Sequence, residues 1–311
     1  MSKKDKLKSK VQDLLPFLCL VLVLLVFQIA TGGKMIGVSN IKPFVREAFT
    51  ILVGACGLAF VLSQGAFDFS MTAGVAVAAA VAARVASVNV YLILPVTIAV
   101  GLLIGLINGA IYAYLHVNPF ITTLAMSFVL SGLDILILGN GSLSVDFQVL
   151  KWDSIGLRIA VMVAVSVIGY ILFEKTRVGK EGKLVGDNPE FARQCGVNVE
   201  WVKIRGYLIT GVTVGIVAFF ALIRSATAST STGAGFNNSA LNAVLLGGMA
   251  ITGGATSKFR SAIIGALVMA TLYLGMNKCG IEAHNQQFIE GVVFMVAVAM
   301  TFDRKNTAVV K

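Results

Sequence analysis

Long, nearly uninterrupted apolar runs constrain the fold of this chain more than any other feature. Hydrophobic residues make up 57% of its 311 positions and charged residues only 13%, whereas a typical soluble domain carries about 25% charged residues. A run of roughly 18 or more apolar residues is long enough to cross the hydrocarbon core of a bilayer as a helix. The sequence therefore predicts an all-α, polytopic transmembrane helical bundle.

Ten spans fit the hydropathy of the chain. They lie at 14–30, 46–63, 70–88, 91–115, 119–138, 158–175, 204–223, 240–253, 258–277 and 285–302. The first follows the basic segment MSKKDKLKSK, but it is long for a signal peptide and lacks a small-x-small cleavage site, so we expect an uncleaved span. Residues 1–311 are thus expected to form one transmembrane domain with a hydrophilic loop at 176–203.

Charge assigns a side of the membrane to each loop. With the N-terminus in the cytoplasm, 17 of the 25 Lys and Arg residues fall on the cytoplasmic side. Basic residues gather in the cytoplasmic loops of membrane proteins, so we expect both termini and the 176–203 loop to face the cytoplasm. The same rule accounts for the net charge of +10. Nucleic-acid binding is not expected, because no basic segment is interleaved with aromatic residues.

Several kinds of chemistry have no motif in the sequence. The four cysteines lie in separate segments without paired spacing, and with only two histidines they predict no metal site. No phosphate-binding G-x-x-x-x-G-K-[ST] loop, nucleophile elbow or zinc motif is present. We therefore expect neither an enzyme nor a chain that binds a cofactor itself.

Small residues indicate close helix packing and an internal repeat. Glycines recur at four-residue spacing in the fourth and seventh spans, as Gly101, Gly105, Gly109, Gly211 and Gly215. Such strips let helix backbones approach each other. Segments 104–106 and 264–266 share an Ile-Gly pair followed by a small or apolar residue. Spans 2–5 begin outside and spans 7–10 begin inside, so this repeat would be inverted, as in many transporters.

An acidic residue lies between the second and third spans, in the segment QGAFDFS at 64–70. Charges at membrane depth are costly and are usually paired or face a cavity. Two interpretations of Asp68 remain open. It caps the third span by accepting the free amides of the first turn, or it contacts a molecule that crosses the membrane. Asp68 and Ser70 are therefore candidates for a translocation path or gate.

The start of the fifth span supplies further polar candidates. Asn118 is a residue type that caps helices, and Pro119 suits the first helical position. Hydroxyl residues such as Thr123 and Ser127 follow on one face. That face either lines a polar path or bonds back to its own helix. We include Asn118, Phe120, Thr123 and Ser127 among the path candidates.

The segment 188–196 is expected to form one short helix inside the basic loop. It has a capping residue and a proline at its start, an acid near the positive end of the helix dipole, and a glycine at its end. Such a helix is a docking element for another protein, or an amphipathic helix on the membrane surface. The residues expected to form the docking element are Asn188, Pro189, Glu190, Ala192, Arg193 and Gly196.

Two of these residues suggest how the docking element would work. Ala192 is small enough to allow close approach of a partner. Arg193 lies three residues after Glu190, on the same helix face, so the two side chains are expected to pair with each other or with the partner.

Four motifs in order resemble the permease subunits of ribose-type sugar ABC importers, the binding-protein-dependent transport system inner membrane component family. The Gly-Gly-Ile-Asp-Leu-Ser-Val-Gly motif of that family is similar to residues 65–72, which keep Gly65, Asp68 and Ser70. Its Pro-Phe-Ile-x-Thr-Leu, Gly-x-Asn-x-Glu-x-Ala-Arg-x-x-Gly-x-Asn and Gly-Gly-x-x-x-x-Gly-Gly motifs are similar to residues 119–124, 186–198 and 247–254.

The resemblance covers about residues 45–303 and implies a function. The chain would form the path for a ribose-like monosaccharide in the bacterial inner membrane, as a pair with a second copy or a sister permease. An extracytoplasmic solute-binding protein would deliver the sugar. Two ATPase subunits would hold ATP and Mg, and the helix within 186–198 would be the coupling helix in the ATPase cleft. The permease itself would be non-catalytic.

Three other functions remain open at this point. Permeases for nucleosides or branched-chain amino acids look broadly alike. A stand-alone, ion-coupled secondary transporter is an alternative of another class, although few acids lie within the spans. A membrane scaffold without transport activity would leave the ordered motifs unexplained.

Overall fold

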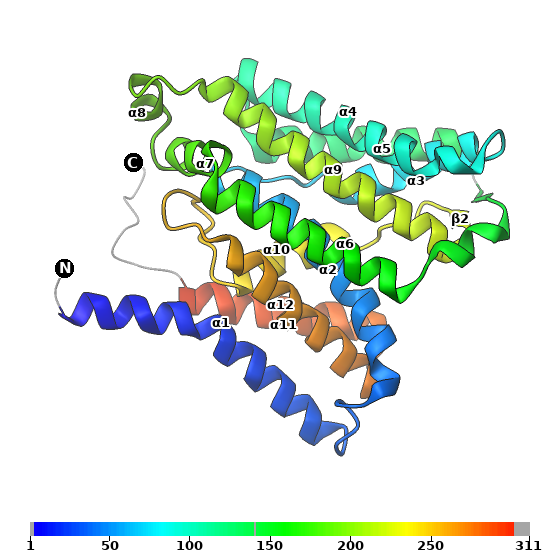
Figure 1. Ribbon diagram of the computed structural model, residues 1–311, viewed down its shortest axis with the longest axis horizontal. Coiled ribbons are helices and arrows are strands. Elements are labelled where there is room, and N and C mark those ends of the chain that lie inside the picture. Colours follow the sequence, from blue (N-terminus) through cyan, green and yellow to red (C-terminus); the bar gives the residue numbers. More distant parts are fainter. Residues whose placement is uncertain (1–2, 140, 302–311) are drawn as a thin grey trace.

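The computed structural model describes residues 3–139 and 141–301, and helices dominate it (Figure 1). The first half contains α1 (Lys3–Ala30), α2 (Ile41–Ser63), α3 (Met71–Ala86), α4 (Ile93–Tyr114), α5 (Pro119–Leu138) and α6 (Ile155–Tyr170), which continues as the π-helical turn η4 (Ile171–Lys175). The second half contains α7 (Arg177–Asp187), α8 (Pro189–Gln194), α9 (Val199–Ser225), α10 (Phe236–Leu246), α11 (Phe259–Lys278) and α12 (Ala283–Thr301). Short 3-10 helices η1 (Val38–Asn40), η2 (Val90–Leu92) and η3 (Phe147–Trp152) lie in the connections.

Six helical segments of the described chain are long and apolar enough to cross a membrane. They are Val38–Ser63, Val90–Tyr114, Pro119–Leu138, Ile155–Lys175, Val199–Ser225 and Phe259–Lys278. Two further apolar helices, Pro16–Ala30 and Met71–Ala86, are shorter. The all-helical, multi-pass prediction is therefore confirmed, and every predicted span overlaps a helix. The number ten stays a prediction. Residue 302 and the basic residues Arg304 and Lys305 lie outside the described residues.

The eighth predicted span differs most from the structure. It was expected at 240–253, but α10 ends at Leu246 after 11 residues, which is about 17 Å of helix at 1.5 Å per residue. Gly247 packs so closely on the backbone of Ser261 that no Cβ would fit there, and Gly248 adopts a φ of +88°. Left-handed backbone of this kind ends a helix. This helix alone is thus shorter than the hydrocarbon core of about 30 Å.

Backbone contact joins α4 to α9. A Cβ atom at Gly101 would meet the carbonyl of Gly211, and one at Gly105 would meet the carbonyl of Tyr207. The same holds at Gly109, where the space is filled by the next turn of α9. The glycine strips thus form a close interface, as predicted from their spacing.

The hydrophobic core centres on α2 and α9. α2 is buried along nearly its whole length and contacts α6, α9, α10 and α11. α5 and α6 lie at the edge and expose large apolar side chains such as Phe128 and Val163, as expected for faces against lipid. α7 and α8 lie together at the end of the bundle where α1 begins (Figure 1).

A buried arginine lies between two aromatic rings at the opposite end of the bundle. Arg158 on α6 is almost completely buried between the rings of Phe49 on α2 and Phe220 on α9, each 5.0 Å from its guanidinium carbon. It also pairs with Asp153. Nearby, strands β1 (Leu143–Ser144) and β2 (Thr227–Ala228) form a two-stranded antiparallel sheet that the sequence did not predict. These contacts tie α2, α6 and α9 together.

Candidate functional site

The short helix α8 forms as its sequence predicts. The Oδ1 atom of Asn188 accepts hydrogen bonds from the backbone N–H of Glu190 (3.0 Å) and Phe191 (3.1 Å), and Pro189 occupies the first helical position. The chain leaves the helix through Gly196, whose φ of +79° lies in the left-handed region. The predicted bounds and capping of this helix are confirmed.

Ion pairs connect α8 to the next helix. Arg193 pairs with Glu190, as expected, and also with Glu200 on the first turn of α9, both at 2.6 Å. The hydrogen bond and the charge of Glu200 raise the pKa of the Arg193 guanidinium above its usual value. The pair of Arg193 with Glu200 was not predicted from the sequence, because the loop that brings Glu200 close to Arg193 has no helical period.

Ala192 does not face a partner, and this expectation was wrong. Its side chain is 0% exposed and packs with Val185, Val199 and Val202 in a small cluster beneath α8. Ala192 lies on the inner face because α8 folds back onto α7 and α9. The neighbouring Phe191 is 52% exposed instead. It is the large apolar side chain that α8 exposes.

The end of α7 contacts two distant loops. Both carboxylate oxygens of Asp187 accept hydrogen bonds from the backbone N–H of Ala255, at 3.0 and 3.1 Å. The N–H of Gly254 donates to the carbonyl of Ser63 at 2.9 Å. A Cβ atom on Gly186 would collide with Ser63 and Gly254. Three segments far apart in sequence therefore meet backbone to backbone.

Glycines allow the backbones of these three segments to lie in direct contact. Gly65 and Gly253 have φ values of +71° and +69°, and a Cβ atom on Gly253 would touch the backbone N of Gly65. The side chain of Gln64 donates to the carbonyl of Val202 at 3.0 Å, so the first turn of α9 also contacts these segments. We call the segments 63–65, 186–187 and 252–255 the glycine junction. It joins the end of α7 to the end of α2 and to the loop between α10 and α11.

The break between α2 and α3 holds a buried polar network. Asp68, 5% exposed, accepts hydrogen bonds from the backbone N–H (2.9 Å) and hydroxyl (2.6 Å) of Ser70. The Ser70 hydroxyl in turn accepts a hydrogen bond from the side chain of Asn108 on α4 at 2.7 Å. Ser70 occupies the N-cap position of α3. Asp68 thus orders the turn before α3 rather than capping the amides of its first turn.

Two other helices hold the same break. The hydroxyl of Tyr207 on α9 donates to the carbonyl of Phe67 at 2.6 Å. The hydroxyl of Thr123 on α5 accepts from the N–H of Phe69 at 3.1 Å and donates to its own helix. The ring of Phe69 also packs edge-on against Phe120, with centroids 5.1 Å apart. The structure therefore brings Thr123 and Phe120 together with the Asp68 segment.

The other two path candidates lie apart from this network. Asn118 is exposed and caps α5, its Oδ1 accepting from the N–H of Phe120 at 2.9 Å. Ser127 is half-buried, and its carbonyl accepts the hydroxyl of Ser131 at 2.8 Å. The hydrogen bonds found for these residues in the described chain all stay within α5.

A second buried network was missed by the sequence analysis. Glu290 on α12 is 8% exposed and accepts hydrogen bonds from Asn242 on α10 and Tyr273 on α11, both at 2.7 Å. The Tyr273 hydroxyl also bonds to Ser239 at 2.9 Å. An acid within the apolar run 285–302 was the available signal. The network holds α10, α11 and α12 together.

The fold and these helix breaks define a multi-pass membrane protein. The family model described as "Branched-chain amino acid transport system / permease component" matches residues 40–298. The chain belongs to this family of permease components, so the predicted resemblance to ABC importer permeases is confirmed.

Individual relatives agree with the family model. The chain is 29% identical to the ribose import permease protein of Bacillus subtilis, over 98% of this chain and 97% of that protein. It is 30% identical to the L-arabinose transport system permease protein of Escherichia coli K12 (80% and 78%) and 28% identical to the galactose/methyl galactoside import permease protein of Salmonella typhimurium (91% and 91%). No solved structure matches it.

Proposed function

We propose that this chain forms the translocation path for a ribose-like monosaccharide in a bacterial ABC importer. Family membership supports the permease role, and three relatives carry names that refer to ribose, L-arabinose and galactose. A solute-binding protein delivers the sugar. Separate ATPase subunits hold ATP and Mg and drive transport, and the permease itself is non-catalytic.

The glycine junction is the observation that carries the proposal. It lies directly before α8, the helix with an exposed apolar side chain at Phe191, and joins the end of α7 to the end of α2 and to the loop between α10 and α11. Coupling needs a rigid element whose position differs between two states. Because the backbones at the glycine junction are in direct contact, movement of α8 against an ATPase would also move the end of α2 and the loop between α10 and α11. The loop at 176–203 is therefore the coupling region of a single membrane domain, residues 1–311.

The path runs beside the break between α2 and α3. Asp68 and Ser70 form its buried polar part, and Thr123 and Phe120 from α5 adjoin it. Asn118, at the N-cap of α5, and Ser127, one turn after Thr123, belong to the approach to this path. Irregular backbone is tolerated at membrane depth where it lines a cavity or is covered by protein, which supports a gate at this position.

An inverted repeat and ten crossings complete the proposed architecture. α4 packs along α9 and α11 packs along α2. Likewise α3 contacts α4 and α9, while α10 contacts α11 and α2. This exchange of partners supports a repeat of spans 2–5 in spans 7–10. The short helices α3 and α10 cross with the help of the irregular segments 64–70 and 229–235.

We place both termini and α7–α8 in the cytoplasm, in the inner membrane of a bacterium. A cysteine probe tests this placement in intact cells. Lys180→Cys, on an exposed site of α7, should escape an external reagent, and Asp146→Cys should react. Lys183, also on α7, is less suitable for the probe, because its ammonium group pairs with Glu174 at 2.7 Å. Labelling of the first site alone would reverse the topology.

The permease is proposed to act as a pair, with a second copy or a sister chain. A branched-chain amino acid substrate is the second candidate, because the family description names it. Nucleoside transport remains a third. A secondary transporter that works alone would use an intramembrane acid, and Glu290 on α12 and Asp134 on α5 are buried acids of this kind.

Reconstituted vesicles distinguish these functions. The chain is co-reconstituted with the ATPase that co-purifies with it and with its binding protein, and uptake of labelled ribose, galactose, leucine and uridine is compared. Uptake of ribose that requires both partners and ATP supports the proposal. Uptake driven by a proton or sodium gradient, without the ATPase, would overturn it.

A further inference from the structure

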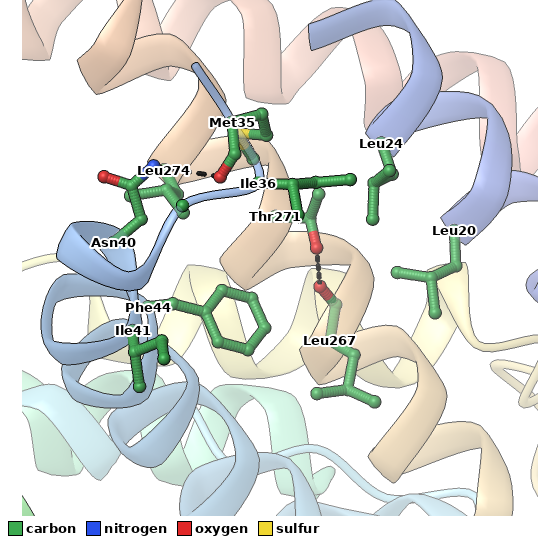
Figure 2. Close-up of a pocket in the computed structure, with 11 residues that line it drawn as sticks. Leu20, Leu24, Met35, Ile36, Asn40, Ile41, Phe44, Leu267, Thr271 and Leu274 are labelled. Carbon is green, nitrogen blue, oxygen red and sulfur yellow. Dashed lines mark hydrogen bonds between the residues drawn. The ribbon is translucent and has the colours of Figure 1, made fainter. Parts of the chain in front are cut away.

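An open apolar groove lies between α1, α2 and α11, away from the helix breaks (Figure 2). Its volume is about 460 Å³, within the range of about 300–1,000 Å³ typical of small-molecule sites. Its main apolar walls are Leu20 and Leu24 of α1, Ile41 and Phe44 of α2, and Leu267 and Leu274 of α11. Figure 2 shows the α1 leucines on one side and Phe44 on the other.

The groove offers little to a sugar. The hydroxyl of Thr271 donates to the carbonyl of Leu267 at 2.7 Å, within its own helix. The amide nitrogen of Asn40 donates to the carbonyls of Lys34 and Met35, at 2.7 and 2.9 Å. Only the buried Oδ1 atom of Asn40 has no partner among the described residues. Because that atom is buried, the lining presents mainly apolar side chains and suits a hydrocarbon chain.

Three exposed lysines are close neighbours of lining residues at the end of the groove where Asn40 lies. Lys34 precedes the lining residue Met35, and Lys42 follows Ile41 in the first turn of α2. Lys278 lies one helical turn beyond Leu274, on the same face of α11. All three are exposed, and none forms an ion pair with a carboxylate of the described residues. An apolar groove with three lysines next to its lining residues matches the acyl chain and the phosphate of an anionic lipid.

We propose that this groove binds one acyl chain of an anionic glycerophospholipid from the surrounding bilayer. The phosphate lies against Lys34, Lys42 and Lys278. Lysines near the ends of membrane helices reach the headgroup region, and each contributes to the attraction of anionic lipid. Bound lipid fills the wedge between α1 and the bundle, and so fixes the position of α1.

Photoreactive lipids test the site in the full-length protein. The purified chain is incubated with phosphatidylglycerol or phosphatidylcholine that carries a diazirine on one acyl chain, and labelled peptides are mapped by mass spectrometry. We expect severalfold more labelling by phosphatidylglycerol, concentrated in 20–24, 35–44 and 267–274. The triple variant Lys34→Gln, Lys42→Gln, Lys278→Gln should lose this preference. Lys151→Gln, an exposed lysine on η3, should retain it.

A second variant separates the groove from the charges. Leu267→Trp should fill the groove and reduce labelling by both lipids, whereas Leu103→Trp, at an exposed position of α4, should not. Equal labelling by both lipids, or labelling unchanged in Leu267→Trp, would overturn the proposal. Disulfide dimers of an Ile36→Cys variant would also overturn it, because a second copy of the chain would then occupy the groove.

Discussion

Both carboxylate oxygens of Asp187, at the end of α7, accept a hydrogen bond from the backbone N–H of Ala255, at 3.0 and 3.1 Å. This contact crosses 68 positions of sequence. It is a side-chain hydrogen bond that holds the end of α7 against the loop between α10 and α11. In the same glycine junction the N–H of Gly254 donates to the carbonyl of Ser63, and the side chain of Gln64 donates to the carbonyl of Val202.

Loss of the hydrogen bond between Asp187 and Ala255 should uncouple ATP hydrolysis from sugar uptake. In Asp187→Ala the N–H of Ala255 loses its acceptor, and a hydrogen bond to a charged group contributes about 1.5–3 kcal/mol. We expect ATP hydrolysis in reconstituted vesicles to continue while sugar uptake falls at least severalfold. Asp146→Ala, which removes a cap from η3 at the other end of the bundle, should leave both rates unchanged. Parallel loss of hydrolysis and assembly would instead assign Asp187 to the ATPase contact.

The network at the first helix break should depend on acceptor atoms more than on charge. Asp68→Asn retains an oxygen for the N–H and hydroxyl of Ser70, and should keep much of the uptake. Asp68→Leu leaves the N–H and hydroxyl of Ser70 without this acceptor, at a cost of about 1–3 kcal/mol per buried group, and should lose most uptake. Uptake is measured at equal amounts of membrane-inserted protein. Normal insertion with no uptake in Asp68→Asn would show that the carboxylate charge itself is required.

The close contact between α4 and α9 should tolerate no side chain. In Gly105→Ala the new Cβ atom would collide with the carbonyl of Tyr207, and overpacking costs about 1–3 kcal/mol. We expect a lower unfolding temperature in detergent. Gly132→Ala, where α5 leaves open space around the glycine, is the matched control and should unfold as the wild type does. Equal unfolding temperatures for the two variants would contradict the packing described.

Local residue patterns predicted the local structure well. The cap at Asn188, the left-handed exit at Gly196 and the pair of Glu190 with Arg193 all depend on residues within nine positions. The strip of glycines on α4 likewise follows from helical periodicity. Such features need only the sequence, because the interacting atoms lie on one turn or one helix face.

Contacts between distant segments could not be predicted in this way. The inward direction of Ala192 depends on how α8 folds back onto Val199 and Val202, and a six-residue helix has too few turns to show which face is buried. The glycine junction and the partners of Glu290 depend on the packing of several helices. The early end of α10 follows from Gly247 and its contact with Ser261, which hydropathy alone does not register.

Photocrosslinking from Phe191 tests the central claim, that α8 receives the motion of an ATPase. A photoreactive phenylalanine derivative replaces Phe191, or Phe147 at the opposite end of the bundle, in membranes that contain the ATPase and the binding protein. Both side chains are exposed. The account predicts that the probe at position 191 captures the ATPase subunit and that the probe at 147 does not. Capture of the ATPase from position 147 alone, or of the binding protein from position 191, would contradict it.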